Sequence, residues 1–241
     1  MDIDELKRKA HKESFEDAFL RHVLRNISIR ITKYLVMTRI TPNHITILSF
    51  IMGILAALCF AARDYTYLLV GAVLFLLSAI LDLVDGEVAR VKSLQSLIGA
   101  WLDPVLDMVK TGMLFLGIAF RFRTDTNQVF VWVTSYLAFF GLVVENFSGS
   151  KQIEVYGKGY VSKVTKVSKS GVLKKLYENL YGFGSITLLL LIGAVLNQLV
   201  VPLILLAFAS NLSWISKFVW VNRKSKRVTS TETSLNSVTS H

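Results

Sequence analysis

The sequence predicts an all-α integral membrane protein with six transmembrane helices, preceded by an N-terminal interfacial amphipathic helix. Of its 241 residues 53% are apolar, and the mean hydropathy of +0.51 is higher than a water-soluble domain of this length normally has. Several apolar stretches reach roughly 20 residues, the length a helix needs to cross a bilayer. No stretch sustains a two-residue alternation, and an open sheet edge is not stable in lipid, so we expect helices.

Residues 1–43 are expected to form the cytoplasmic and interfacial N-terminal segment. The first 19 residues contain acids and lack an apolar core followed by a small-residue cleavage site, so they do not form a removable signal peptide. Beyond them, apolar residues recur every four positions between basic ones: Phe15, Phe19, Val23, Ile27, Ile31 and Leu35. Such a stripe suits a helix lying among anionic headgroups. A helix docked on the rest of the protein is the alternative, and the two are compatible.

The six predicted spans lie in a membrane domain over residues 44–222. Their approximate ranges are 44–62, 66–90, 97–120, 128–148, 176–196 and 199–220. The second and third are apolar over most of their length but polar where they meet. After the last span, residues 223–241 are rich in Ser and Thr, and we expect a disordered cytoplasmic tail.

The basic residues indicate which side of the membrane each connection faces. The net charge is +10, and most Lys and Arg residues lie in 1–43, 90–96, 149–175 and beyond residue 217. Arg63, Arg121 and Arg123 are the basic residues of the opposite connections. The positive-inside rule therefore predicts a multi-pass protein of the cell membrane with both termini cytoplasmic. Because membrane sidedness accounts for the charge, no nucleic acid partner is expected.

Four aspartates lie inside or at the edge of the second and third predicted spans. Asp82 and Asp85 are three residues apart, and Asp103 and Asp107 are four apart, so each pair shares one helix face. At ~1.5 Å per residue from the turn at 91–96, the two pairs lie at overlapping depths. Helices joined by so short a turn pack side by side. We therefore expect the four carboxylates to form one cluster.

This cluster favours a divalent cation, because carboxylates a few Å apart cannot all stay ionised unaided. A structural ion pair with Lys110 or Arg90 is the alternative for any single acid. The two helices contain no Cys or His, so the hard cations Mg²⁺, Mn²⁺ and Ca²⁺ are better served than zinc. Mg²⁺ keeps positions open for water and phosphate oxygens, so a phosphorylated ligand is expected.

Small and basic residues flank the aspartates. Gly86 and Ala89 follow Asp85, and Gly99 precedes Asp103, which leaves room for a ligand to approach the backbone. Arg90 could clamp a phosphate with two parallel hydrogen bonds, or could anchor the helix end among lipid headgroups. Both interpretations of Arg90 stay open at this point.

Residues 82–107 read DLVDGEVARVKSLQSLIGAWLDPVLD and fit the pattern D-x2-D-G-x2-A-R-x8-G-x3-D-x3-D without a gap. This pattern resembles the signature of the CDP-alcohol phosphatidyltransferase family. The six spans, the amphipathic helix and the sequence Thr41-Pro42-Asn43 before the first span are also similar to that family. The resemblance therefore covers nearly the whole chain except the tail.

The resemblance implies roles for residues at the matching positions. It assigns Asp82, Asp85 and Asp103 to metal coordination, and Asp107 to the general base and to a second metal, which implies Mg²⁺ or Mn²⁺ with two ions per active site. The implied CDP-binding residues are Thr41, Pro42, Asn43, Asp82, Gly86, Ala89, Arg90 and Gly99. It further implies a polar cavity that opens to the cytoplasm among the six helices, and a homodimer.

The acceptor side is less marked in the sequence. Residues 25–46 are similar to family members that handle inositol phosphates, in archaea especially, although Met108 and residues 181–187 lack the basic side chains of those relatives. Residues 149–175 carry seven lysines, which could hold a phosphorylated acceptor or attract anionic lipids. The candidate acceptor-binding residues are Lys110, Glu145, Lys151, Lys158 and Lys163.

The sequence thus predicts a membrane transferase of phospholipid biosynthesis. It would move a substituted phosphoryl group from a CDP-linked lipid, of the CDP-diacylglycerol or CDP-archaeol type, to a small polar alcohol such as an inositol phosphate or glycerol phosphate, releasing CMP. Transfer from a soluble CDP-alcohol to a lipid or polyol is an alternative. A divalent-cation transporter is an alternative of another class, although its carboxylates would be expected along the whole crossing.

Overall fold

The computed structural model describes residues 6, 9–10, 19–157 and 183–238, and all regular structure in these ranges is helical. The helices are α2 (Phe19–Leu35), α3 (Pro42–Ala61), α4 (Tyr65–Val91), α5 (Leu97–Arg121), α6 (Gln128–Tyr156), α9 (Phe183–Val195) and α10 (Val200–Val238). The predicted spans 44–62, 66–90 and 97–120 therefore agree with α3, α4 and α5 to within two residues at each end.

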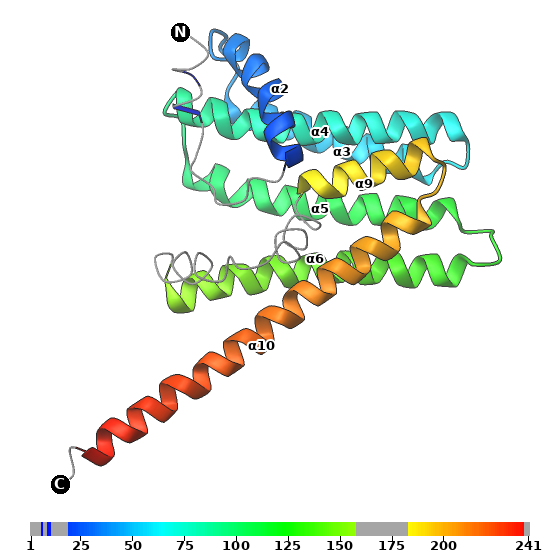
Figure 1. Cartoon of the computed structure of the whole chain (residues 1–241). Coiled ribbons are helices and arrows are strands. Elements are labelled where there is room, and N and C mark those ends of the chain that lie inside the picture. The colour runs from blue at the N-terminus through cyan, green and yellow to red at the C-terminus, as the bar shows by residue number, and fades with distance from the viewer. Residues whose placement is uncertain (1–5, 7–8, 11–18, 158–182, 239–241) are drawn as a thin grey trace.

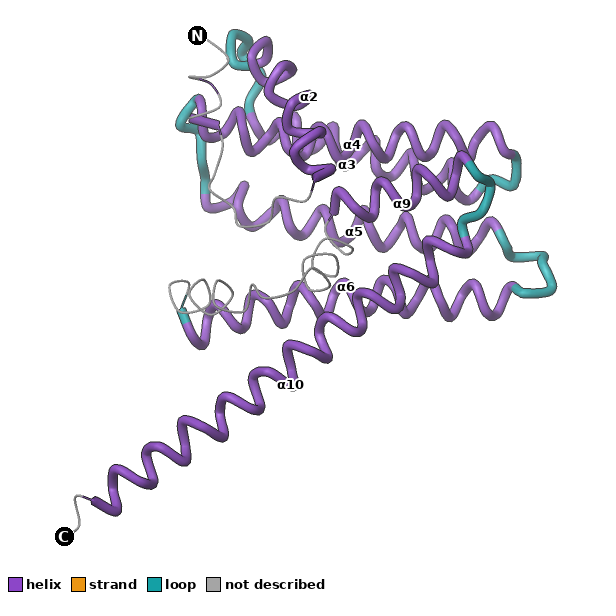
Figure 2. Tube along the Cα trace, in the orientation of Figure 1, coloured by secondary structure: helices purple, strands orange, loops and turns teal. Residues whose placement is uncertain are grey.

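Helices α3 to α6 and α9 run side by side along one direction, whereas α10 leaves this bundle at an angle (Figure 1). α3 packs on both α4 and α5, and α6 packs on α5 and α10. The connections 62–64, 122–127 and 196–199 gather at one end of the bundle, on the right of Figure 2, and the 92–96 connection lies at the other end. The motif aspartates are near this second end.

The turn between α4 and α5 is short because both helix ends are capped. Ser93 adopts φ 55°, and the N–H of Leu94 donates to the carbonyl of Ala89 at 2.9 Å, which is the six-to-one bond of a Schellman motif. On the other side of the turn, Ser96 is the N-cap of α5 and its Oγ accepts the N–H of Gly99 at 3.0 Å. The turn makes α4 and α5 antiparallel, but the expectation that they pack side by side is wrong: α3 packs on both of them, and the described helices α4 and α5 do not pack on each other.

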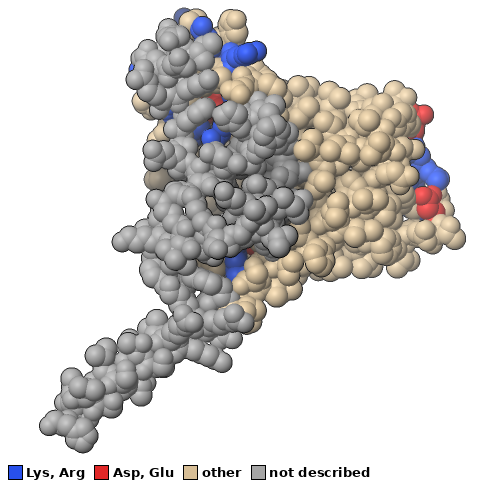
Figure 3. Space-filling view, in the orientation of Figure 1, with Lys and Arg blue, Asp and Glu red and all other residues tan. Residues whose placement is uncertain are grey.

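The interior is apolar between the helices, and much of the outer surface is apolar as well. Phe60, Phe75 and Phe115 are fully buried in one cluster with α6, α9 and α10 residues. Large apolar side chains also point outward along α3, among them Ile51 and Leu58. Figure 3 shows a broad face without charged side chains, bounded by acidic and basic residues at one end. An apolar exterior of this kind suits contact with lipid.

Four helices in the described part of the chain are long and apolar enough to cross a membrane: Pro42–Ala61, Tyr65–Val91, Gln128–Val155 and Val200–Val219. The other two predicted spans differ from these for separate reasons. α5 has 25 residues but carries Asp103, Asp107 and Lys110 within its apolar run. α9 has 13 described residues, and the part of the predicted fifth span before Phe183 lies outside the described residues.

Two boundaries differ from the sequence-based expectation. α6 continues to Tyr156, about two turns beyond the predicted end at 148, and Gly157 ends it at φ 75°. α10 continues to Val238, so the structure has a helix where a disordered tail over 223–241 was expected. The physical reason is that no Gly or Pro follows Pro202, so nothing in the backbone interrupts the helix.

α2 is docked on the bundle. This agrees with the interpretation of the N-terminal segment as a helix that packs on the rest of the protein. Leu24, Ser28 and Thr32, spaced four apart, are buried against α4, whereas Ile27 from the expected membrane stripe is 43% exposed. The buried face includes two hydroxyl groups because these meet the carboxyl group of Glu87 on α4, at 2.7 Å each. The docked face is thus rotated from the apolar stripe.

Candidate active site

Asp82, Asp85 and Asp103 come together between α4 and α5, as the spacing predicted. Each offers a carboxylate oxygen, and the three oxygens lie within 4.8 Å of one another. Asp85 is buried, and Asp82 and Asp103 are half-buried. Three acids so close in an apolar bundle repel one another unless a cation lies among them.

The polar atoms of this group fit a hard metal ion. Oδ1 of Asp103 is buried and has no hydrogen-bond partner, although buried carboxylate oxygens are normally paired. Oδ2 of Asp85 accepts a hydrogen bond from Thr46 Oγ1 at 2.6 Å, which orients that carboxylate. The group contains oxygen donors alone, the set that Mg²⁺ and Mn²⁺ prefer.

Asp107 does not belong to the three-aspartate group and forms an ion pair with Lys110 instead. The Lys110 ammonium lies 2.7 Å from Asp107 Oδ1 and 3.6 Å from Asp82 Oδ1. The lysine is 1% exposed, so it faces the acids from inside the bundle. The cluster predicted from four aspartates is therefore three aspartates plus an Asp107–Lys110 ion pair.

The sequence did not predict the polar contacts that Ser49 and Ser78 make next to Lys110. Ser49 Oγ accepts a hydrogen bond from the Lys110 ammonium at 3.3 Å. Ser49 and Ser78 are also tied to each other, since the Ser49 hydroxyl donates to the Ser78 carbonyl at 2.9 Å and the Ser78 hydroxyl donates back to the Ser49 carbonyl at 2.8 Å. Ser49 and Ser78 each lie inside a long apolar span, and that was the signal that could have identified these contacts.

The Thr41-Pro42-Asn43 segment lies beside the start of α5. Thr41 caps α3 and Pro42 is its first residue. A Cβ atom built on Gly99 would come 3.6 Å from the side-chain oxygen of Asn43, so these two residues face each other. Lys92 fixes the preceding turn by donating to the carbonyls of Thr38 at 2.7 Å and Ile40 at 2.9 Å.

Arg90 is oriented toward the N-terminal segment. Its Nε donates a hydrogen bond to the carbonyl of Ala10, so part of the guanidinium is engaged within the chain. A guanidinium nitrogen of Arg90 also lies 3.2 Å from the position that a Cβ on Gly86 would take. Neither of the two sequence-based interpretations of Arg90 anticipated the backbone contact, because the partner is 80 residues away in the sequence.

The candidate acceptor residues are found in different places. Glu145 on α6 is buried and forms an ion pair with Lys217 on α10, while its Oε2 is buried without a hydrogen-bond partner. Lys151 is exposed and pairs with Glu154 at 2.7 Å. Lys110 points into the aspartate cluster, as described above. The remaining two candidates, Lys158 and Lys163, lie outside the described residues.

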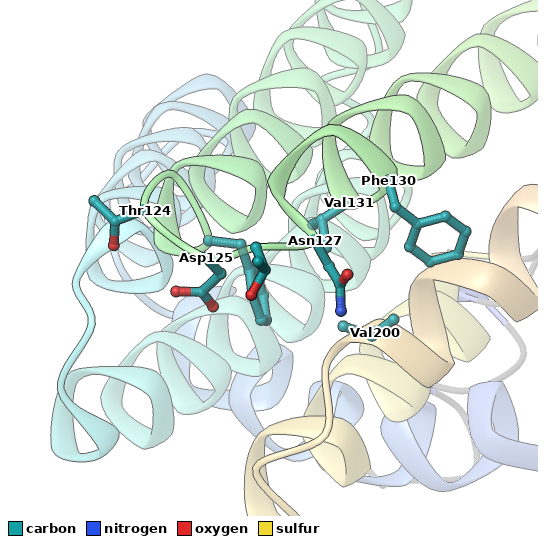
Figure 4. A pocket seen from close by; sticks show the side chains of 8 residues that line it. Thr124, Asp125, Asn127, Phe130, Val131 and Val200 are labelled. Atoms are coloured by element: carbon teal, nitrogen blue, oxygen red, sulfur yellow. The ribbon is translucent and has the colours of Figure 1, made fainter.

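A cavity of about 520 Å³ lies at the opposite end of the bundle, where α5 connects to α6. Figure 4 shows Thr124, Asp125, Asn127 and Phe130 around it, with Val200 from the start of α10. It contains none of the motif residues. We therefore assign the candidate active site to the aspartate group and not to this cavity.

Residues 39–221 match the sequence profile of CDP-alcohol phosphatidyltransferases. The chain belongs to the CDP-alcohol phosphatidyltransferase family. The family match covers α3 to α6, α9 and the first half of α10, and it includes every residue of the signature described above.

Among relatives of this transferase family member, the bifunctional IPC transferase and DIPP synthase of Aquifex aeolicus is 31% identical over 159 residues, which cover 64% of this chain and 35% of that protein. The archaetidylinositol phosphate synthase of Pyrococcus horikoshii is 28% identical over 130 residues, covering 54% of this chain and 64% of that protein. The chain thus spans about a third of the Aquifex protein's length.

The fold resembles that of a solved membrane enzyme. Phosphatidylinositol phosphate synthase of Mycobacterium tuberculosis, solved with CDP-DAG bound, superimposes with a TM-score of 0.59 at 19% identity, over 80% of this chain and 92% of that one. A structure of the same enzyme in complex with manganese and citrate gives a TM-score of 0.58 at 18% identity, over 79% and 87% of the two chains. This similarity concerns the fold.

Proposed function

We propose that this protein transfers a substituted phosphoryl group from a CDP-linked lipid to a small polar alcohol and releases CMP. The donor would be of the CDP-diacylglycerol or CDP-archaeol type, and the acceptor an inositol phosphate or a glycerol phosphate. The observation that carries the proposal is the convergence of Asp82, Asp85 and Asp103 within 4.8 Å, in a chain with the complete family signature. The inositol phosphate chemistry of the relatives favours that class of acceptor.

Asp82, Asp85 and Asp103 would hold Mg²⁺ or Mn²⁺, which neutralises pyrophosphate charge when bound and so helps CMP to leave. Around it, the chain positions the reactants. Thr46 fixes the Asp85 carboxylate through its 2.6 Å hydrogen bond. A second ion at Asp107, as the family resemblance implies, would have to share that carboxylate with Lys110, which lies 2.7 Å from it.

Asp107 is proposed as the general base that takes the proton of the acceptor hydroxyl. It is adjacent to the metal-binding group through Lys110 but does not belong to the three oxygens that lie together. Its side chain is 28% exposed, so an acceptor can reach it. A base must lie within hydrogen-bond reach of the proton that it removes, and a partly open carboxylate satisfies this requirement.

The nucleotide is proposed to lie between the N-terminal end of α3 and the turn from α4 to α5. Asn43 and Gly99 already face each other there, and Thr41 and Pro42 directly precede Asn43. Gly86, Ala89 and Arg90 would line the α4 side. Arg90 donates to the carbonyl of Ala10 through Nε, and its two terminal nitrogens lie on the side of Gly86.

The acceptor is proposed to approach from the α6 side, where Glu145, Lys151, Lys158 and Lys163 are the candidate residues. The unpaired buried Oε2 of Glu145 supports this direction, since a hydroxyl of a polyol could donate to it. We further propose a multi-pass protein of the cell membrane with six spans, both termini cytoplasmic, and a homodimeric assembly. The distribution of basic residues supports the sidedness.

Two other functions were open from the sequence. Transfer from a soluble CDP-alcohol to a lipid acceptor uses the same chemistry and the same aspartates. A divalent-cation transporter is disfavoured by the family membership, and the described acids of α4 and α5 cluster toward one end of the bundle instead of following the crossing.

The reaction is tested with purified protein, Mg²⁺ and a panel of CDP-alcohols offered with inositol phosphate, glycerol phosphate or a lipid alcohol. Mass spectrometry then identifies the product that forms together with CMP. We expect product and CMP in equal amounts from a CDP-lipid and a polyol phosphate. Cation flux into liposomes without any CMP release would reject the transferase proposal.

Asp107→Asn tests the proposed base. The amide keeps the size of the side chain but cannot accept the proton, so we expect CMP release to fall by about 10²–10⁴-fold. Binding of the CDP-lipid, measured by calorimetry, should persist because the three-aspartate group is intact. Full activity of Asp107→Asn would show that another group is the base.

A further inference from the structure

The buried ammonium of Lys110 is an unusual feature for a site that is expected to bind two divalent cations. Lys110 lies on α5, one helical turn after Asp107, and is 1% exposed within a membrane-embedded bundle. A buried ammonium is stable only when acceptors surround it. Here Asp107 Oδ1 lies at 2.7 Å, Ser49 Oγ at 3.3 Å and Asp82 Oδ1 at 3.6 Å.

The neighbouring helices are shaped to hold this lysine in one position. Gly53 on α3 lies against its aliphatic stem, because a Cβ at Gly53 would come 2.3 Å from both Cγ and Cδ of Lys110. Ser49, one turn earlier on α3, supplies the hydroxyl acceptor, and its bonds with Ser78 fix α3 against α4 at this depth. The space that holds the Lys110 side chain is therefore formed by the packing of α3, α4 and α5.

The position of the ammonium determines which carboxylates remain available to metal. Asp82, Asp85 and Asp103 offer oxygens within 4.8 Å of one another, whereas Asp107 is held by Lys110 and is not part of that group. An ion placed between Asp107 and Asp82 would lie where the ammonium already is. Two cations cannot share that space, because they repel each other strongly in a bundle of low dielectric constant.

We infer that Lys110 takes the place of a second metal ion, so that this chain binds one divalent cation, at Asp82, Asp85 and Asp103, and uses the ammonium to position Asp107. The inference rests on the proposed function, since it assigns a role within the same site. In this arrangement Lys110 is a positioning residue: it holds one oxygen of Asp107 and leaves the partly exposed side of that carboxylate to the acceptor. This role also means that Lys110 is no longer a candidate acceptor-binding residue.

Manganese binding to the full-length protein in detergent tests the inference, with Mn²⁺ alone as the probe. Equilibrium dialysis should give one Mn²⁺ per wild-type chain at saturation, and its electron paramagnetic resonance spectrum should be that of an isolated ion. Lys110→Met should bind two, with the line broadening of neighbouring ions, because Asp107 and Asp82 become free to bind metal. Two ions in the wild type, or one in a folded Lys110→Met variant, would overturn the inference.

Two further variants keep the test decisive if Lys110→Met does not fold. Lys110→Arg retains the positive charge and should still bind one ion. Asp107→Asn should bind one ion with less than a twofold change in affinity, because Asp107 is not a ligand. A tenfold loss of affinity would contradict the inference. CMP release from the same preparations separates the two proposals. If the wild type binds one ion but releases no CMP, the proposed transfer reaction is wrong. If it binds two ions and releases CMP, only the proposed role of Lys110 is wrong.

Discussion

Asp85 is the most enclosed of the motif aspartates, and its environment shows how single residues prepare this site. The residue is 5% exposed, and its carboxylate accepts a hydrogen bond from the Thr46 hydroxyl at 2.6 Å. Thr46 Oγ1 also lies 3.2 Å from the carbonyl oxygen of Pro42, so the same side chain connects the start of α3 to the metal-binding group. Residues that orient a ligand in this way contribute to metal affinity without touching the metal.

At the residue scale we predict that Thr46→Val weakens Mn²⁺ binding by about 10–100-fold, because the Asp85 carboxylate loses the donor that orients it. Valine has nearly the same shape, so the change isolates the hydroxyl. Calorimetric titration of the purified protein with Mn²⁺ measures the effect. Thr46→Ser keeps the hydroxyl and is the matched control, for which affinity should stay near the wild-type value. Equal affinity in Thr46→Val would show that Asp85 needs no such support.

Between elements, α3 and α5 approach each other closely at Gly117. A Cβ atom on Gly117 would lie 2.2 Å from the carbonyl oxygen of Ala57, which is backbone and cannot turn aside. The absence of a side chain at Gly117 therefore allows α5 to pack tightly on α3. Since α5 carries Asp103, Asp107 and Lys110, this contact sets their distance from Ser49 on α3.

We predict that Gly117→Ala destabilises the protein by about 1–3 kcal/mol, because the added methyl group forces the two helices apart. Thermal unfolding in detergent should show a lower midpoint. Gly149→Ala is the matched control, since its Cβ would lie 3.5 Å from the Lys217 amine, an ordinary contact. That control should be neutral or more stable by up to about 1 kcal/mol, as alanine favours a helix. Equal midpoints for the two variants would contradict the packing argument.

The second contact between elements joins α2 to α4 through a buried polar group. Glu87 is 2% exposed and accepts hydrogen bonds from Ser28 and Thr32 at 2.7 Å each. Glu87 is on the same helix as Asp82 and Asp85 but faces α2. The docking of α2 therefore depends on two hydroxyl groups as well as on the apolar contacts of Leu24.

Replacing both hydroxyls, in Ser28→Ala with Thr32→Ala, should remove two hydrogen-bond donors from a buried carboxyl group at a cost of about 1–3 kcal/mol. We expect α2 to open more often, which hydrogen exchange in peptides covering residues 24–35 would report as faster exchange. Asn26→Ala, on the exposed face of α2, should leave exchange unchanged. If the double variant kept the protection of the wild type, the apolar contacts alone would hold α2.

At the scale of the whole molecule, the two ends of the bundle differ in chemistry. One end carries the aspartate group and the Thr41-Pro42-Asn43 segment. At the other end, Arg63 pairs with Asp125 at 2.9 Å and donates to Thr124, and Arg121 donates to the carbonyl of Ala62, which fastens the 62–64 connection to the 122–127 connection. The aspartate group and this ion pair therefore lie at opposite ends of the bundle.

We predict that the aspartate end faces the cytoplasm. Because Cys59 is the sole cysteine, a Cys59→Ala background allows single cysteines to be placed at Gln95 and at Thr126, both exposed and at opposite ends. A membrane-impermeant maleimide added to intact cells should label Thr126→Cys and not Gln95→Cys. After the membrane is permeabilised, both should react. Labelling of Gln95→Cys in intact cells would reverse the proposed orientation.

Most helix positions could be predicted from the sequence, whereas the rotation of α2 could not. α3, α4 and α5 agree with their apolar runs within two residues. The reason is that each run is preceded by a polar N-cap residue: Thr41, Asp64 and Ser96. α6 extends beyond its apolar run because no Pro interrupts it, although its last turns are polar. The rotation of α2 could not be read from its apolar stripe, since the polar partner Glu87 lies 55 residues or more away.

The sequence by itself determined that the chain is helical, that it belongs in a membrane, and that four aspartates lie at overlapping depths, of which three come together in the structure. Helix geometry and a short turn fix those relations locally, so spacing alone is sufficient. The tertiary structure decided that Lys110 turns inward between Asp82 and Asp107, that Thr46 supports Asp85, and that Arg90 reaches Ala10. These contacts depend on how each helix is rotated against partners distant in the chain, and packing of the whole bundle sets that rotation.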